Sequence, residues 1–275
     1  MIDLASEQQL VPQRRRKLPT KRLEVREVRW DEFYDWFVGF YRQNQHVTLI
    51  GPTQTGKTTI AREILEAREC VIAIAIKPED EVAESFVEYG YRIQEKRDIP
   101  TVEKAGRPVP HPAYRRIVLW PRAEQDRDGR WRSIPQMTAY QRSVIMDAIN
   151  YVRKARRWTL FTDDLNTLAE DLKLGPEVKW ILRNGASAKI SLVGAGQRPA
   201  WLPREAYSSP EHLFFLATND ADDLDRLSNI GAGVDKKELA HVISNLKLYE
   251  TLYLAPRVHP PILIKTKVEI GRSRS

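Results

Sequence analysis

Short apolar runs alternate with amphipathic stretches along most of the chain. The apolar runs predict β-strands at 46–50, 70–76, 115–120, 158–162, 190–195, 212–217, 249–254 and 262–267. The amphipathic stretches predict helices at 30–44, 57–68, 79–88, 136–156, 165–172, 176–185, 220–229 and 235–244. Strands that alternate with helices indicate an α/β fold, in which a mostly parallel sheet carries helices on both faces. Ligands of such sheets bind at the carboxyl ends of the strands.

The chain divides into a short basic segment and one larger unit. Residues 1–28 are expected to form a flexible N-terminal arm, and 29–270 a single domain. Within that domain, 89–135 is rich in charge and proline, so we expect an insertion or long loops, with a turn at 126–129. The aromatic residues of 30–44 have helical spacing, which favours a place in the core over a base-stacking platform.

A phosphate-loop pattern follows the first predicted strand. The strand-before, helix-after context argues against a chance match in a surface turn. The backbone N–H groups of such a loop, with the positive end of the helix dipole, surround a polyphosphate. Lys57 would reach the β- and γ-phosphates and Thr58 would hold Mg²⁺. The sequence therefore predicts a site for ATP or GTP formed by Gly51, Pro52, Thr53, Gln54, Thr55, Gly56, Lys57, Thr58 and Thr59.

Two acidic residues end the predicted strand at 158–162. Asp163 is placed to act as a Mg²⁺ carboxylate, directly or through water. Asp164 would face the region beyond the γ-phosphate, where a carboxylate orients or deprotonates water. A helix N-cap is the alternative for this pair. The long interval between Lys57 and Asp163 leaves room for at least one further strand between the two motifs.

The predicted strand at 190–195 leads into Gln197-Arg198-Pro199. At the phosphate end of the site, the neutral amide of Gln197 would bond to the γ-phosphate or to the attacking water. Pro199 stops the strand and fixes the turn that follows. Lys57, Asp164 and Gln197 are therefore the candidate catalytic residues.

In their order and spacing, the three motifs resemble the FtsK–HerA superfamily of P-loop motor ATPases. The resemblance covers about 46–255, and the segment 201–235 is similar to phage and actinobacterial members. The superfamily includes chromosome and plasmid DNA pumps, end-resection helicase partners and viral genome-packaging ATPases. The resemblance implies a RecA/FtsK-like sheet, ATP with Mg²⁺, and translocation of double-stranded DNA by a homo-oligomeric ring, usually a hexamer. It also implies viral or transfer-machinery proteins as partners.

Three positions depart from the superfamily pattern. Gly196 replaces a usual Thr or Ser, Ala186 stands where an arginine often follows glycine, and Asp164 replaces a usual Glu. The missing arginine could have reached the nucleotide of a neighbouring subunit, which leaves Arg183 and Arg198 as candidates for that role. The departures bear on the rate of hydrolysis rather than on ATP binding.

The charge balance is basic. Lys and Arg number 44 against 37 Asp and Glu, which gives a net charge of +7 and a pI of about 9.4. This balance favours a polyanionic partner, nucleic acid first, over an ordinary basic soluble protein. Sequence-independent contact with phosphates suits a translocase. Candidates for that contact, with solvated loops as the alternative, are the arm at 14–22 and the basic segment from Arg115 to Arg132, including Arg122, Arg127 and Arg130.

The cysteine content and the lengths of the apolar runs indicate the cellular location of the protein. The single cysteine, Cys70, lies in an apolar run and is expected in the core. No apolar run approaches the roughly 20 residues that span a bilayer, and the first residues lack the layout of a signal peptide. We therefore expect no membrane anchor and a cytoplasmic location.

Two other functions fit the phosphate loop. One is a non-motor P-loop NTPase with a regulatory or phage-assembly role, and the other is a small-molecule kinase. A fused nuclease is not expected, because no acidic cluster has metal-ligand spacing.

Overall fold

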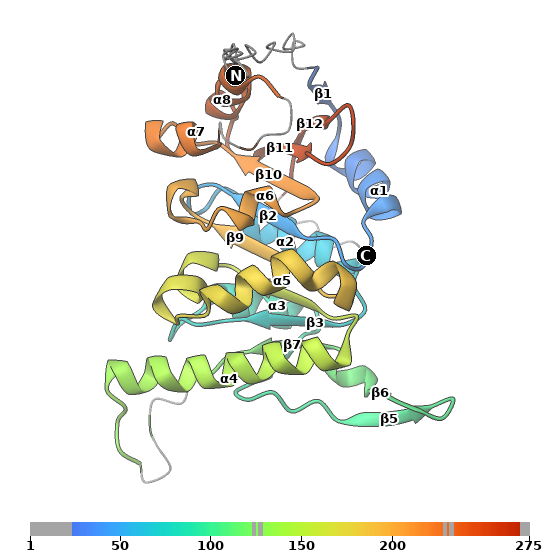
Figure 1. The fold of residues 1–275 in the computed structure, drawn as a ribbon, viewed down its shortest axis with the longest axis vertical. Helices are drawn as coiled ribbons and strands as arrows, with labels where there is room; N and C mark the ends of the chain where they lie inside the picture. Colours follow the sequence, from blue (N-terminus) through green and yellow to red (C-terminus); the bar gives the residue numbers. More distant parts are fainter. Residues whose placement is uncertain (1–23, 123–124, 126–128, 228–229, 231–233, 270–275) are drawn as a thin grey trace, which may run out of the picture.

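The computed structural model describes residues 24–122, 125, 129–227, 230 and 234–269. Within these residues, one mixed sheet has the strand order β1-β12-β11-β10-β2-β9-β8-β3-β7-β4 (Figure 1). All strands from β10 to β4 in this order are parallel. β11 runs antiparallel to both β10 and β12. The predicted α/β class, with a mostly parallel sheet, is confirmed.

The central strands are buried on both faces. Every residue of β2, β9, β8, β3 and β10 is buried, as expected where helices cover both sides of a parallel sheet. The parallel strands are β10 (His212–Leu216), β2 (Val47–Ile50), β9 (Ser191–Gly196), β8 (Thr159–Thr162), β3 (Val71–Ile74), β7 (Arg116–Leu119) and β4 (Arg92–Gln94). Beyond β10 the sheet continues with β11 (Glu250–Ala255), β12 (Ile262–Lys267) and β1 (Arg26–Glu27).

Helices pack on the two faces as separate groups. Figure 1 shows α4, α5 and α6 in front of the sheet and α2 and α3 behind it. The rear group is α1 (Trp30–Phe40), α2 (Lys57–Glu66) and α3 (Glu81–Glu88). The front group is α4 (Ile134–Ala155), α5 (Gly175–Ala188), α6 (Glu205–Ser208), α7 (Ala221–Leu227) and α8 (Lys236–Ser244). Short turns are η1 (Pro112–Tyr114), η2 (Thr167–Asp171), which is π-helical where a longer helix was predicted, and η3 (Pro199–Trp201).

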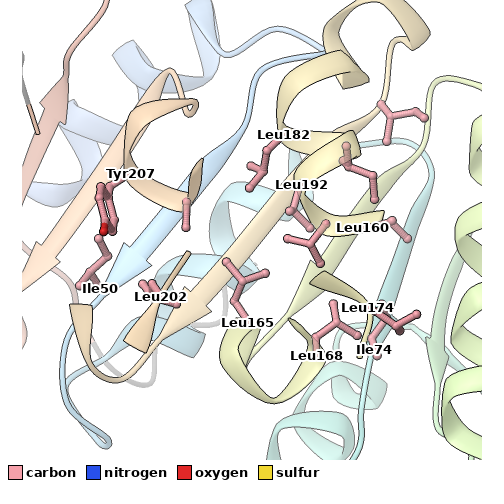
Figure 2. Packing of buried hydrophobic residues seen from close by; sticks show 14 of the residues in the cluster. Ile50, Ile74, Leu160, Leu165, Leu168, Leu174, Leu182, Leu192, Leu202 and Tyr207 are labelled. Atoms are coloured by element: carbon pink, nitrogen blue, oxygen red, sulfur yellow. The ribbon is translucent and has the colours of Figure 1, made fainter. Parts of the chain in front are cut away.

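Two apolar clusters fill the space between the sheet and these helices. The front cluster includes Leu160, Leu165 and Leu192 beside the ends of β8 and β9 (Figure 2). The rear cluster contains Phe33 and Phe37 of α1, fully buried against strand residues. The predicted core role of the aromatic helix is confirmed, because Trp30, Phe33, Tyr34 and Phe37 are buried, although Trp36 of the same helix is 40% exposed.

The charged segment 89–114 is not irregular, contrary to the prediction. β4 pairs with β7 in the main sheet, and β5 (Thr101–Lys104) pairs with β6 (Arg107–Pro110) in a hairpin that projects beyond it (Figure 1). β5 is exposed along its whole length and β4 lies at the sheet edge, so neither needs the apolar residues that reveal a buried strand. The turn predicted at 126–129 falls largely outside the described residues.

Residues 26–28, which were expected to belong to the N-terminal arm, pair with the main sheet. Arg26 and Glu27 form β1, paired with Ile264 and Lys265 of β12, and the Val28 N–H donates to the Lys265 carbonyl at 3.0 Å. Backbone pairing holds this polar segment, which is why its side chains gave no strand signal. The basic run 14–22 lies outside the described residues.

Cys70 is half-buried rather than enclosed in the core. Its side chain packs against the front cluster, and burial raises the pKa of its thiol to about 11. The thiol therefore stays protonated at neutral pH.

Candidate nucleotide-binding site

The phosphate loop joins β2 to α2 and depends on two glycines. A Cβ at Gly51 would lie 2.7 Å from the Cβ of Leu216, closer than such atoms approach, so no side chain fits there. Gly56 has a φ of +105°, which side-chain-bearing residues rarely adopt, and it precedes the first residue of α2. The Gly51 N–H donates to the Gly196 carbonyl at 3.1 Å. The start of the loop is thereby tied to the end of β9.

Lys57 is buried within this loop. Its ammonium donates to the Gly51 carbonyl at 2.8 Å and also to the Pro52 carbonyl. Burial lowers the pKa of Lys57, and the charges of Asp163 and Asp164 act in the opposite direction. A buried cation this close to the loop carbonyls is suited to an anionic ligand, because phosphate oxygens would supply the counter-charge that the carbonyls lack.

Thr58 and Asp163 meet at the start of α2. The Thr58 hydroxyl donates to the Asp163 carboxylate at 3.2 Å, although the two residues lie on elements far apart in sequence. Burial raises the pKa of Asp163, while Lys57 and then Lys77 lower it. A hydroxyl and a carboxylate oxygen at this separation are the hard oxygen donors that Mg²⁺ prefers, so these two residues fit that metal.

Lys77 was missed as a member of the site. It follows β3, and its charge acts on both Lys57 and Asp163. The Trp120 indole donates to the Lys77 carbonyl at 2.8 Å, which fixes the backbone there. The Lys77-Pro78 pair after a strand was the only sequence signal for it.

The other residues of the predicted phosphate loop lie between β2 and the first turn of α2. The Thr55 hydroxyl donates to the Pro52 carbonyl at 2.7 Å, and Gln54 has a φ of +60° at the exposed tip. Thr53 is exposed, and Thr59 is half-buried in the first turn of α2. Their contacts with phosphate remain predictions.

Asp164 has a structural role in addition to any catalytic one. Its Oδ1 accepts the N–H groups of Asn166 at 3.1 Å and Thr167 at 3.0 Å, which caps the turn that leads into η2. The N-cap alternative to a water-activating carboxylate is therefore present in the structure. Oδ2 makes neither of these contacts, so both roles are compatible in one side chain.

Gln197 follows the end of β9, and this strand lies between β2 and β8 in the sheet. The interval between Lys57 and Asp163 holds the further strand that was expected, because β3 and β7 of the main sheet both fall within it. Since β2, β9 and β8 are parallel, the phosphate loop, Gln197 and the acidic pair all lie at one edge of the sheet. That arrangement is what a nucleotide spanning the three strand ends requires.

Gly196 is explained by packing. A Cβ at this position would lie 2.6 Å from both Cδ atoms of Leu202, a buried residue of the front cluster that Figure 2 shows beside Ile50. Leu202 therefore occupies the space that a Thr or Ser side chain would need.

Gly196→Ala is expected to destabilise the fold by about 1–3 kcal/mol, because the added methyl overpacks against Leu202. Urea unfolding of Gly196→Ala, Leu202→Ala and the double variant would measure this. In the double variant the loss should fall below the sum of the single losses, because the truncated side chain no longer meets the new methyl. Additive losses would show that the Leu202 contact is not the cause.

The two candidate arginines form ion pairs within the same chain. Arg198 pairs with Asp220 at 2.5 Å and with Asp223 at 3.5 Å, and these charges, Asp223 first, raise its pKa. Arg183 on α5 pairs with Glu205 at the start of α6. Reaching a neighbouring subunit would require either arginine to leave its partner. Their role in trans remains a prediction.

Several basic candidates for DNA contact stabilise the chain itself. Arg115 pairs with Glu69 at 2.6 Å, and Arg116, which begins β7, donates to backbone carbonyls after α2. These lie at the amino ends of the strands, opposite the phosphate loop. Arg122 stacks over Trp120, and Arg132 stacks over Tyr140 and donates to the Gln125 carbonyl. For Arg130, contact with DNA remains a prediction. Arg127 lies outside the described residues.

Comparisons with known proteins give matches in structure but not in sequence. No family model matches the chain, and no curated protein matches it. The genome-packaging NTPase B204 of Sulfolobus turreted icosahedral virus 2, in complex with AMPPCP, has a TM-score of 0.52 at 15% identity over 81% of this chain and 98% of that chain. The DNA-packaging ATPase B204 of Sulfolobus turreted icosahedral virus has a TM-score of 0.55 at 16% identity, over 84% of this chain and 100% of that chain.

A further structural neighbour is a VirB4 protein. VirB4 of Thermoanaerobacter pseudethanolicus has a TM-score of 0.56 at 13% identity, over 82% of this chain and 89% of that chain. The chain shares the fold of these three structures. The motif-based resemblance is thereby confirmed at the level of fold. Among the described helices, none has the length and apolar character needed to cross a bilayer.

Proposed function

We propose that this chain is an ATP-driven motor ATPase that translocates or packages double-stranded DNA as a homo-oligomeric ring. The observation that carries the proposal is that the phosphate loop, the acidic pair and Gln197 follow three neighbouring parallel strands, β2, β8 and β9, at the same end of the sheet. The Thr58 hydroxyl donates a hydrogen bond to Asp163 at 3.2 Å, which joins the first two motifs. Structural neighbours described as genome-packaging and DNA-packaging ATPases support the choice of DNA as the substrate.

Each residue at the edge has a proposed task. Lys57 holds the β- and γ-phosphates, and Thr58 and Asp163 hold Mg²⁺, which would neutralise phosphate charge during transfer. Asp164 accepts the proton of the attacking water through the oxygen that does not cap η2. Gln197 bonds to that water or to the γ-phosphate. An arginine of the next subunit, Arg183 or Arg198, stabilises the transition state.

A second candidate function is a non-motor P-loop NTPase that works without a ring. The specific observation in its favour is that Arg183 and Arg198 are both occupied by carboxylates of their own chain. A protein that does not insert an arginine into the nucleotide site of a neighbouring subunit needs no arginine without an ion-pair partner in its own chain.

Double-stranded DNA is expected to raise the steady-state ATPase rate several-fold, because phosphate contacts would favour the assembled ring. The stimulation should fall steeply as salt rises from about 50 to about 200 mM, since backbone contacts release counterions. Lys57→Ala with the same DNA provides the background rate. DNA-independent turnover together with a monomeric elution volume would contradict the motor and favour the second candidate.

A further inference from the structure

We propose that Tyr249, supported by the buried Val268 beside it, forms the platform on which the nucleobase of the bound nucleotide stacks. The inference rests on the proposed nucleotide binding and deepens it, because the motifs account for the phosphates and leave the nucleoside without a site. The class of ligand is a purine base, held by apolar and aromatic contact.

Both residues lie at the sheet edge that carries the phosphate loop. Tyr249 immediately precedes β11, and Val268 immediately follows β12. The two strands are antiparallel, with Glu250 opposite Lys267, so the start of one and the end of the other lie together. The Val268 N–H donates to the Tyr249 carbonyl at 3.0 Å, which joins the pair directly.

The pair borders the last glycine of the phosphate loop. A Cβ at Gly56 would lie 3.2 Å from the Cγ1 of Val268 and 3.4 Å from the Cδ1 of Tyr249. These are the nearest side chains to that position, so the ring and the valine form the wall beside the backbone that would hold phosphate. A nucleoside attached to those phosphates would begin within reach of this wall.

The strand order gives the direction in which the nucleoside lies. Asp163 and Gln197 follow β8 and β9, on one side of β2, and they mark the γ-phosphate end. β10, β11 and β12 lie on the other side of β2. A triphosphate that extends from the acids across the loop therefore carries its nucleoside toward Tyr249 and Val268.

The local chemistry suits a flat apolar ligand. Val268 is buried, and Tyr249 is half-buried and packs against the rear cluster. Tyr249 has a φ of +66°, and the Glu250 N–H, which donates to the Lys247 carbonyl at 2.9 Å, helps to fix the turn. Non-glycine residues in this region are uncommon. Base–aromatic stacking gives affinity with little discrimination between bases.

The test compares a ligand that has a base with one that lacks it. Binding of ATP and of inorganic tripolyphosphate, each with Mg²⁺, would be measured by calorimetry on the full chain. Tyr249→Ala should weaken ATP about tenfold or more, the size of one lost stacking contact, and leave tripolyphosphate unchanged. Tyr249→Phe should keep the affinity for ATP, because the ring face remains. If Tyr249→Ala fails to fold, Tyr249→Leu retains apolar bulk beside Gly56 and should likewise weaken ATP while leaving tripolyphosphate unchanged.

Two controls separate this inference from the proposed function. Leu248, 58% exposed next to Tyr249, offers a matched change, and Leu248→Ala should bind both ligands as the wild type does. Lys57→Ala should weaken both ligands. Equal weakening of ATP and tripolyphosphate by Tyr249→Ala would show that the ring only supports the loop, and no weakening of ATP would place the base elsewhere; either result overturns the platform. A wild-type chain that binds neither ligand would instead refute the nucleotide site itself.

Discussion

Lys57→Ala is expected to abolish measurable ATP hydrolysis and to weaken ATP binding about a hundredfold. The buried ammonium now donates to the carbonyls of Gly51 and Pro52, and in the nucleotide complex it would donate to phosphate oxygens. Hydrogen bonds from a charged donor contribute about 1.5–3 kcal/mol each, and about 3 kcal/mol corresponds to roughly a hundredfold in Kd. Calorimetric titration with ATP and Mg²⁺ would measure the loss.

The fold should survive this change. Burial lowers the pKa of Lys57, which means that the charge costs free energy in the folded chain. Removing it should leave thermal stability unchanged or higher, and Lys57→Met, which keeps the length of the side chain, provides the matched control. A variant that binds ATP normally would contradict the assignment of the loop, whereas one that simply unfolds would point to a structural role for the ammonium.

Asp164→Asn is expected to bind ATP normally and to lower kcat about a hundredfold or more. An amide cannot accept the proton of the attacking water, and general-base catalysis is worth about 10²–10⁴-fold. The substitution is well matched to the structure, because the asparagine oxygen can still accept the N–H groups of Asn166 and Thr167. Steady-state ATPase rates at saturating ATP would give kcat, and calorimetry would give the affinity.

Asp164→Ala separates the two roles of this side chain. It removes both the negative charge and the cap, so it should lose activity and also about 1 kcal/mol of stability in urea unfolding. If Asp164→Asn kept full activity while Asp164→Ala lost stability, the carboxylate would be a cap alone. The water-activating group would then have to be another residue at this edge.

The central sheet could be predicted from the sequence because burial on both faces makes its strands continuously apolar. β2, β3, β8, β9 and β10 lie within about two residues of the predicted ranges. β1, β4 and the β5–β6 hairpin could not be predicted, since exposed or edge strands are held by backbone pairing that leaves no apolar pattern.

The phosphate loop and its strand–helix context were visible in the sequence, but the surroundings of the site were not. The carboxylate that pairs with Arg183 lies in α6, and those that pair with Arg198 lie in α7 and directly before it. No local sequence pattern predicts which carboxylate a surface arginine will contact. The role of Asp164 could not be predicted either, because the sequence pattern of an acidic residue after a strand is the same whether that residue caps a turn or activates water. The contact of Leu202 with Gly196 could not be predicted from the sequence, because it depends on how η3 packs against β9.

The pairing of β1 with β12 sets a practical boundary for work on the basic arm. Arg26 and Glu27 cover the backbone of Ile264 and Lys265, which would otherwise present unpaired N–H and C=O groups to other molecules. A truncation that also removes β1 would expose the edge of β12 to aggregation. The effect of the lost charge could then not be separated from the effect of lower solubility. Removing only residues 1–23, or neutralising the arginines of 14–22 in place, isolates the electrostatic contribution while β12 keeps its pairing with β1.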